Sequence, residues 1–214
     1  MEKCKEENSK LTIVDHHHNV RMENNGLSFD YRPYHDLFIS SLAEYRMIAA
    51  CLAVEATNLL SEQFPVKEDL LKEGLKKSKL KCRFEVISGE PTIILDGAHN
   101  PEGIEQLRKD IDRTFLGKPI HVVFAAFRDK NIAQMLPEIG LIGDITLTTF
   151  DNPRARNEDD YFLYLEDYKY EDNFEALINR LMEEHKEDVI LITGSLAFTY
   201  VAREYLKKKG IING

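Results

Sequence analysis

Hydrophobic and polar positions follow two different rhythms along the chain. Before residue 62, short apolar runs at Leu11–Val14 and Leu27–Tyr31 precede a helical spacing over residues 41–62. We expect two short strands, then an amphipathic helix, then a second short helix over residues 67–76. The apolar side of the longer helix is predicted to carry Leu42, Tyr45, Ile48, Ala49, Leu52, Val54, Leu59 and Leu60. We interpret the basic stretch at residues 76–81 as a linker.

From residue 80 onward, apolar strand-like runs alternate with amphipathic helix-like runs. This alternation predicts an α/β fold with a mostly parallel, Rossmann-like sheet covered on both faces. The first two strand-like runs are joined only by Ser88–Pro91, which is too short for a parallel crossover, so we expect an antiparallel edge hairpin. The strand-like runs are 83–88, 92–96, 120–126, 144–150 and 189–193, and the helix-like runs are 102–115, 131–139, 172–186 and 196–209.

Composition narrows the class of protein. The 214 residues suffice for one full domain and part of another, and 43% hydrophobic residues can build a core. The net charge of −9 argues against nucleic-acid binding, which needs a basic surface. Cys4, Cys51 and Cys82 are few and widely spaced, as expected for free thiols in a reducing compartment. With neither a signal-peptide pattern nor a membrane-spanning apolar run, we expect a cytoplasmic protein.

The most informative stretch is Leu95-Asp96-Gly97-Ala98-His99-Asn100-Pro101. It predicts a buried strand, a tight turn and a helix that begins at the carboxyl end of the strand. Ligands of open α/β sheets collect at such places. Asp96 and His99 are the candidates for polar chemistry, whereas Gly97 and Asn100 are expected to shape the turn.

The motif L-D-G-A-H-N-P resembles the signature of the folylpolyglutamate synthase and dihydrofolate synthase family of Mur-type amide ligases. The resemblance implies that residues 80–214 form the C-terminal, glutamate ligase domain. It also implies that residues 1–79 are a remnant of the central ATPase domain and a linker. No G-x-x-x-x-G-K-[ST] phosphate loop occurs, and Tyr45, Arg46 and Ala49 replace the family's His-Gln and later Asn. We therefore expect an ATPase domain encoded upstream, or a diverged and shortened relative.

The resemblance assigns cofactor-binding roles to Asp96 and Arg83. Asp96 is expected to accept hydrogen bonds from the ribose hydroxyls of ATP; alternatively, it bonds to N–H groups of its own turn. Arg83 matches the arginine of a family G-R-x-E segment, in which the guanidinium reaches the nucleotide phosphates. Here Cys82 stands where that segment has glycine. The alternative for Arg83 is an ordinary residue at a strand edge.

The catalytic candidates are His99 and Ser195. By resemblance, His99 lies near the acyl phosphate or the incoming glutamate; otherwise it is a surface histidine in a turn. Ser195 follows Thr193-Gly194 at another strand–turn–helix junction, and its hydroxyl is expected to hold the carboxylate of the incoming amino acid. The simpler role for Ser195 is the N-cap of the helix, and the two roles are compatible.

Three further segments carry charge or metal-binding groups. The basic loops at residues 127–131 and 152–156 follow predicted strands and could attract a polyanionic substrate, although each alone reads as solvated charge. His16-His17-His18 would point alternately to opposite faces of an extended segment, which makes a poor joint site. We expect no metal ligand in this chain.

The predicted function is the C-terminal part of an ATP-dependent amide ligase. It would add L-glutamate to a folate or dihydropteroate carboxylate through an acyl-phosphate intermediate. ATP and Mg²⁺ are the implied cofactors, held mainly by the ATPase domain, so the chain alone is expected to be inactive. A cell-wall Mur-type peptide ligase and a non-catalytic binding module that lost the ATPase half are the alternatives. We expect neither nucleic acid nor membrane among the partners.

Overall fold

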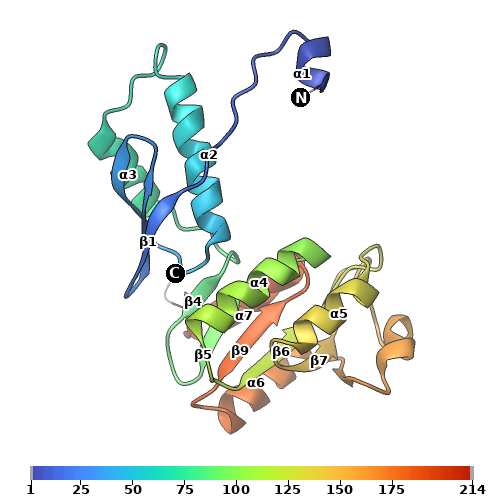
Figure 1. Ribbon diagram of the computed structural model, residues 1–214. Helices are drawn as coiled ribbons and strands as arrows, with labels where there is room; N and C mark the ends of the chain where they lie inside the picture. Colours follow the sequence, from blue (N-terminus) through green and yellow to red (C-terminus); the bar gives the residue numbers. More distant parts are fainter. Residues whose placement is uncertain (1, 213–214) are drawn as a thin grey trace. The chain divides into compact units, whose positions relative to one another are not determined.

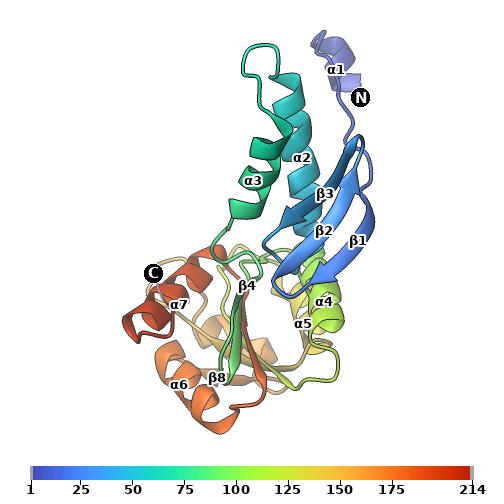
Figure 2. The same cartoon turned by 90° about the vertical axis from the view of Figure 1, so that its left-hand side faces the viewer.

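The computed structural model describes residues 2–212, which form two compact units, residues 2–79 and residues 80–212. The first unit contains an antiparallel sheet in the order β1-β2-β3, and helices α2 and α3 pack beside it (Figure 2). Its elements are α1 (Glu2–Glu6), β1 (His18–Glu23), β2 (Gly26–Tyr31), β3 (Tyr34–Ile39), α2 (Tyr45–Leu59) and α3 (Glu68–Lys77).

The strands of the first unit depart from the sequence prediction. The prediction of a strand at Leu11–Val14 is wrong, because these residues adopt no regular secondary structure. Strand β1 pairs with β2 instead. All six residues of β1 are exposed, so backbone pairing at a sheet edge holds it without an apolar pattern. Strand β3 was not predicted. It follows β2 through a turn in which Arg32 has φ +51°, a left-handed conformation without a glycine to signal it.

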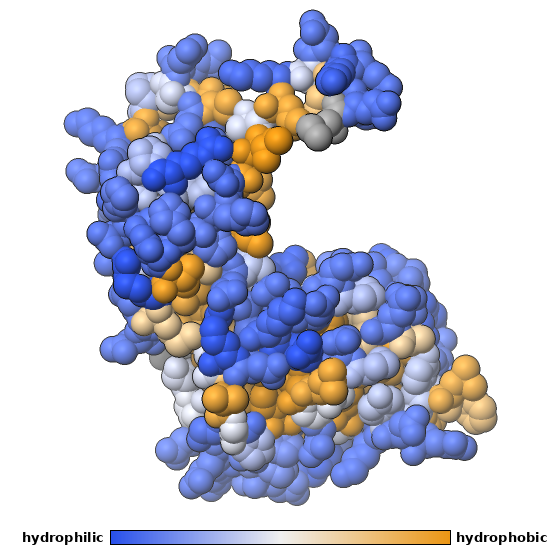
Figure 3. Space-filling model, in the orientation of Figure 1, coloured by the Kyte–Doolittle hydropathy of each residue, from blue (hydrophilic) through white to orange (hydrophobic). Residues whose placement is uncertain are grey.

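Helix α2 forms where the hydrophobic spacing predicts, but of the apolar side chains predicted to be buried within it only Val54 is fully buried. Met47, Cys51 and Val54 lie in the core of the first unit against the sheet. Ile48, Leu52 and Leu59, which the pattern placed on the apolar side, are each more than half exposed. Apolar side chains therefore line two faces of α2, and Figure 3 shows hydrophobic residues gathered along this helix.

The second unit is built on a six-stranded sheet in the order β4-β5-β9-β6-β7-β8, and it confirms the predicted α/β fold. Strands β4 and β5 pair antiparallel at one edge, as expected, and the remaining neighbours are parallel. Helices α4 and α5 cover one face and α6 and α7 the other (Figures 1 and 2). The elements are β4 (Glu85–Ile87), β5 (Thr92–Leu95), α4 (Pro101–Thr114), β6 (Ile120–Phe124), α5 (Ile132–Gly140), β7 (Asp144–Thr148), η1 (Asp159–Tyr164), β8 (Lys169–Glu171), α6 (Phe174–Glu184), β9 (Val189–Thr193) and α7 (Leu196–Lys208).

Strand β9 lies between β5 and β6 and determines where the candidate site forms. Leu95 pairs with Ile192, and Phe124 pairs with Thr193, so three strands end side by side at their carboxyl ends. The 3₁₀ helix η1 and the three-residue edge strand β8 were not predicted, because both are too short for a clear period. None of the helices within residues 2–212 has the length and apolar character needed to cross a bilayer.

Candidate functional site

Two tight turns, one after β5 and one after β9, meet at the carboxyl edge of the sheet. The N–H of Gly194 donates to the carbonyl of Ala98 at 3.2 Å. A Cβ on Gly97 would lie 2.7 Å from Cδ1 of Leu196, so only glycine lets this turn pack against the start of α7. The structure thus brings the Asp96–His99 turn and the Ser195 turn together.

Asp96 organises the first turn through its carboxylate. The residue is 2% exposed; Oδ1 accepts from the N–H of Ala98 and Oδ2 from the N–H of Phe84, both at 2.8 Å. The carboxylate therefore ties the segment before β4 to the turn after β5. The alternative role, bonding to turn N–H groups, is present, and the ribose contact stays a prediction.

Helix α4 begins at Asn100, which is its N-cap. The Asn100 side-chain oxygen accepts from the N–H of Gly103 at 2.9 Å, and Pro101 occupies the first helical position. The expected turn-shaping role of Asn100 is confirmed. The remaining N–H groups of this helix end lie at the carboxyl edge of the sheet, where they favour an anion.

His99 is held in the turn by one ring nitrogen. Its Nδ1 lies 2.9 Å from the carbonyl oxygen of Gly97. A carbonyl only accepts, so Nδ1 carries the hydrogen, and in the neutral ring Nε2 is an acceptor. Within residues 2–212 no hydrogen bond engages Nε2, which leaves it available to a ligand group that donates a proton.

Ser195 begins α7 in the same way that Asn100 begins α4. The residue is 3% exposed, and its hydroxyl oxygen accepts from the N–H of Ala197 at 3.2 Å, which confirms the N-cap role. The hydroxyl of Thr199 donates to the backbone carbonyl of Ser195 at 3.1 Å. Because β5 and β9 are neighbours, the N-terminal ends of α4 and α7 open at adjacent positions on one edge.

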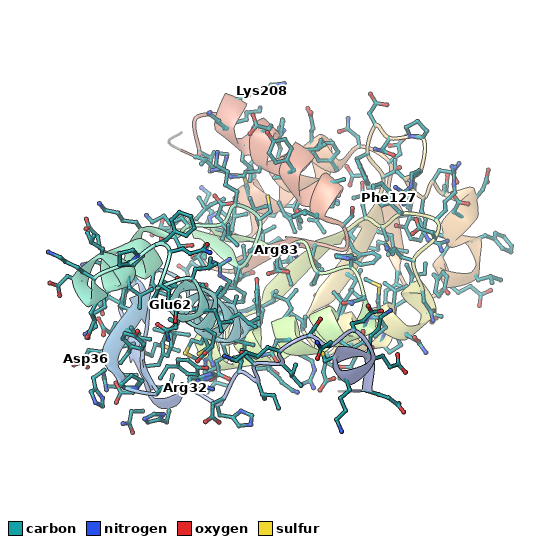
Figure 4. All side chains as sticks on the ribbon, turned by 90° about the horizontal axis from the view of Figure 1, so that it is seen from above. Arg32, Asp36, Glu62, Arg83, Phe127 and Lys208 are labelled. Atoms are coloured by element: carbon teal, nitrogen blue, oxygen red, sulfur yellow. The ribbon has the colours of Figure 1, made fainter. Side chains whose placement is uncertain are left out.

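Arg83 precedes β4 in a strained segment (Figure 4). Cys82 and Phe84, its two neighbours, have φ values of +56° and +50°, in the left-handed region that favours glycine. This explains why a glycine suits the position of Cys82 in the G-R-x-E pattern. Within the described residues Arg83 forms neither an ion pair nor a side-chain hydrogen bond, so its guanidinium remains available to a ligand.

Glu85 is a positioning residue that the sequence analysis missed. Its carboxylate accepts from Nε of the buried Arg203 in α7 at 2.9 and 3.0 Å, and from the N–H of Cys82 at 2.8 Å. These bonds attach the Arg83 segment to α7. The available signal was the acidic position of the G-R-x-E pattern, but nothing near it in sequence indicates Arg203 as the partner.

The two basic loops interlock through backbone and side-chain bonds. Phe127 forms an isolated antiparallel bridge with Ala155, and the Arg154 guanidinium lies 4.4 Å from the centre of the Phe127 ring (Phe127 is labelled in Figure 4). Arg154 bonds to Asp129 at 2.9 Å, and Arg128 to Asp160 at 2.8 Å. These arginines lower the pKa values of the two carboxyl groups. Much of the positive charge is thus compensated inside the loops.

A separate hollow of about 390 Å³ lies at the other end of the same sheet edge. Its lining carries three acidic side chains, Asp151, Asp172 and Glu175. None of the four predicted site residues lines it. An acidic lining disfavours an anionic ligand, so the region of Asp96, His99 and Ser195 remains the better candidate for one.

These features define the class of protein to which the chain belongs. Residues 82–196 match the sequence profile of the Mur ligase, glutamate ligase domain family, and the chain is a member of that family. Half of the chain or more lies within this match, including Arg83, Asp96, His99 and Ser195.

The relatives include both folate-pathway synthases and cell-wall Mur ligases. The chain is 30% identical to dihydrofolate synthase/folylpolyglutamate synthase of Bacillus subtilis over 181 residues, covering 81% of this chain and 42% of that protein. The crystal structure of folylpolyglutamate synthase from Thermotoga maritima superposes with a TM-score of 0.74 at 25% identity, covering 99% of this chain and 51% of that one.

A third relative was crystallised with ligands. The structure of a bifunctional folylpolyglutamate synthase/dihydrofolate synthase contains Mn, AMPPNP and L-glutamate. It shares the fold with a TM-score of 0.70 at 22% identity, over 86% of this chain and 45% of that one. The chain thus spans about half the length of the relatives it matches.

Proposed function

We propose that this chain acts as the C-terminal part of an ATP-dependent ligase that joins L-glutamate to a folate or dihydropteroate carboxylate. The observation that carries the proposal is the pair of adjoining turns bearing His99 and Ser195 within a glutamate ligase domain. In this reaction ATP phosphorylates the acceptor carboxylate, and the glutamate amine then displaces phosphate from the acyl phosphate.

The carboxyl edge of the sheet suits the anionic groups of such a reaction. Two helix N-termini open there, and both have defined N-caps at Asn100 and Ser195. We assign the carboxylate of the incoming glutamate to the N-terminal end of α7, beside Ser195. Nε2 of His99 is assigned to the reacting groups as a hydrogen-bond acceptor from the glutamate ammonium or amine.

Arg83 and Asp96 are assigned to the nucleotide. The guanidinium of Arg83 lacks a partner among residues 2–212 and offers two parallel donors to a phosphate. Asp96 accepts from the backbone N–H groups of Phe84 and Ala98, and we assign its carboxylate to a ribose hydroxyl of the nucleotide. ATP supplies the phosphoryl group when bound.

Magnesium is not assigned to residues of this edge. The Asp96 carboxylate is already bonded to two backbone N–H groups, and Glu85 is bonded to Arg203. Neither offers the open oxygen geometry that Mg²⁺ requires. We therefore propose that the metal ligands and the phosphate loop belong to an ATPase domain.

The exposed stripe of α2, formed by Ile48, Leu52 and Leu59, is proposed as the surface that packs against this ATPase portion. The three residues recur at helical spacing and are each more than half exposed. A solvent-facing apolar stripe beside a second, buried apolar face is typical of a helix covered on both sides. On this proposal the first unit is a remnant of the ATPase domain and the chain alone has no ligase activity.

The test measures ligand binding and catalysis on the full chain. Nuclear magnetic resonance titration with L-glutamate is expected to shift the amide signals of Ser195 and Ala197, and AMPPNP those of residues 83–85. In Ser195→Ala the glutamate shifts should weaken, whereas Thr57→Ala, at a partly exposed threonine in α2, is the matched control. Absence of any response to both ligands contradicts the proposal.

A ligase assay separates the remaining alternatives. The full chain is incubated with ATP, Mg²⁺, labelled L-glutamate and either dihydropteroate or a reduced folate, and no product is expected. Product formation would refute inactivity of the chain alone while supporting the ligase class. Shifts only with a nucleotide-linked muramoyl peptide would favour a cell-wall ligase instead.

A further inference from the structure

Two histidines and an aspartate converge at the edge of the sheet opposite the candidate functional site. His121 is the second residue of β6, Asp188 immediately precedes β9, and His185 is the C-cap of α6. All three therefore lie at the amino ends of the parallel strands, whereas Asp96 and Ser195 lie at the carboxyl ends. This second location is independent of the proposed ligase function.

The donor atoms of the three side chains point at a common position. Oδ2 of Asp188 lies 2.9 Å from Nε2 of His121 and 3.1 Å from Nδ1 of His185. One ligand atom from each residue lies within 4.8 Å of the others. Metal–ligand bonds of about 2.0–2.1 Å in a tetrahedral site place neighbouring ligand atoms about 3.3 Å apart, so small shifts would admit an ion.

The two imidazole rings of the cluster also lie against one another. The imidazoles of His121 and His185 stack with their centroids 3.7 Å apart, at an interplanar angle of 33°. Two neutral imidazoles and a carboxylate brought together in this way can bind one divalent cation.

The backbone around the cluster is held in place before any ion binds. The N–H of Val189 donates to the carbonyl of Pro119 at 3.0 Å, and the N–H of Asp188 to that of His185 at 3.2 Å. Each of the three side chains is between 14% and 32% exposed, so the cluster is sheltered yet reachable from solvent. Preorganised ligands on fixed backbone lose little entropy on binding.

We propose that His121, His185 and Asp188 form a binding site for a divalent transition metal of the Zn²⁺ class, with a fourth position open to water. Two imidazole nitrogens and one carboxylate oxygen select Zn²⁺, Co²⁺ or Ni²⁺ over Mg²⁺, which prefers oxygen ligands. The ion joins the amino end of β6 to the loop between α6 and β9. Its expected effect is stabilisation of the second unit.

The experiment uses the full chain with four other candidate ligands removed. In this background His16, His17 and His18 are changed to Gln and Cys4 to Ser, because these residues could bind metal by themselves. Calorimetric titration with Zn²⁺ after chelator treatment should show one site, and Mg²⁺ should not compete. Co²⁺ should give the intense visible absorption of a four-coordinate ion, and Zn²⁺ should raise the unfolding temperature.

Variants of the cluster decide the outcome. His121→Gln and Asp188→Asn keep side chains of similar size and are each expected to weaken Zn²⁺ binding at least tenfold and to abolish the thermal shift. His35→Gln is the matched control, because His35 also pairs with an aspartate, Asp30, at 3.4 Å but has no second histidine. That variant should bind Zn²⁺ normally.

A measurement on the natural chain tests the proposal even if the variants fail to fold. Ring-nitrogen resonances of His121 and His185 should move together at one equivalent of Zn²⁺, with the Cys4 and His16–His18 signals unchanged. The proposal is overturned if Zn²⁺ binds the background chain no more tightly than Asp188→Asn, or if the rings of His121 and His185 do not respond.

Discussion

The buried Arg203 in α7 donates from Nε to both carboxylate oxygens of Glu85, at distances of 2.9 and 3.0 Å. The two residues are 118 positions apart in the chain. Glu85 also accepts from the N–H of Cys82 at 2.8 Å, so the pair attaches the Arg83 segment to the second unit. Arg203 is 4% exposed, and its other ion pair, with Glu204, is longer at 3.8 Å, so loss of Glu85 would leave a buried cation with only this weaker partner.

We therefore expect Glu85→Gln to destabilise the second unit by about 3 kcal/mol, the lower end for breaking a buried ion pair, because Glu85 is partly exposed. Denaturant unfolding measures the change. The control is Glu105→Gln, which removes an exposed pair with Lys109 and should leave stability unchanged. Equal effects in both variants would contradict the positioning role of Glu85.

The N-cap of α4 offers a second test. Asn100→Ala removes the side-chain acceptor for the N–H of Gly103 and should cost about 1 kcal/mol of unfolding free energy. Asn131 stands at the same position before α5 but makes no side-chain cap bond, so Asn131→Ala should have little effect. A similar loss of unfolding free energy in both variants would contradict a stabilising N-cap bond at Asn100.

Gly194 combines a left-handed backbone with a close approach. Its φ is +105°, and an added Cβ would lie 2.6 Å from the carbonyl oxygen of Ala125. Gly117 has φ +76° with nothing within 4 Å of an added Cβ, so Gly117→Ala should cost only the backbone strain of about 1–2 kcal/mol. Gly194→Ala should be clearly less stable than Gly117→Ala in thermal unfolding, because the clash adds to the strain.

The two faces of α2 should respond differently to substitution. Met47 is fully buried, and Met47→Ala is expected to cost about 2–5 kcal/mol. Leu52 is 53% exposed, and Leu52→Gln should change stability by no more than about 0.5 kcal/mol. Urea unfolding of the first unit provides the comparison. A large loss with Leu52→Gln would mean that the exposed stripe is packed within the chain itself and does not await a partner.

Burial predicts which cysteines react. Burial raises the pKa of the Cys51 thiol to about 11, so its thiolate is scarce at neutral pH, and burial also raises the pKa of Cys82. Alkylation of the folded chain at about pH 8, read by mass spectrometry, should modify the partly exposed Cys4 alone. In the denatured chain all three cysteines should be alkylated. Rapid labelling of Cys51 in the folded chain would contradict this burial.

Much of the second unit was predictable because its signals are local. The apolar run before Asp96, the Pro101 at the first helical turn and the short link before β5 each specify backbone conformation within a few residues. The same holds for the N-cap of Ser195. Resemblance then added the family, which the match over residues 82–196 bears out.

The first unit shows where local signals fail. Strand β1 has no buried residue, and β3 follows a turn without glycine, so neither carries the pattern that identifies a strand. For α2, apolar residues surround most of the helix, and the period alone does not reveal which face meets the sheet. Packing against β2 and β3 decides that choice.

By itself, the sequence determined the family, the strand–turn–helix junctions at Asp96 and Ser195, and the α/β class, because hydrogen bonds and side-chain patterns within a few residues specify these features. Only the tertiary structure decided that Glu85 pairs with Arg203 and that His121 meets His185 and Asp188. Such contacts join residues from distant elements. They depend on how the whole sheet pairs and packs, which no local pattern encodes.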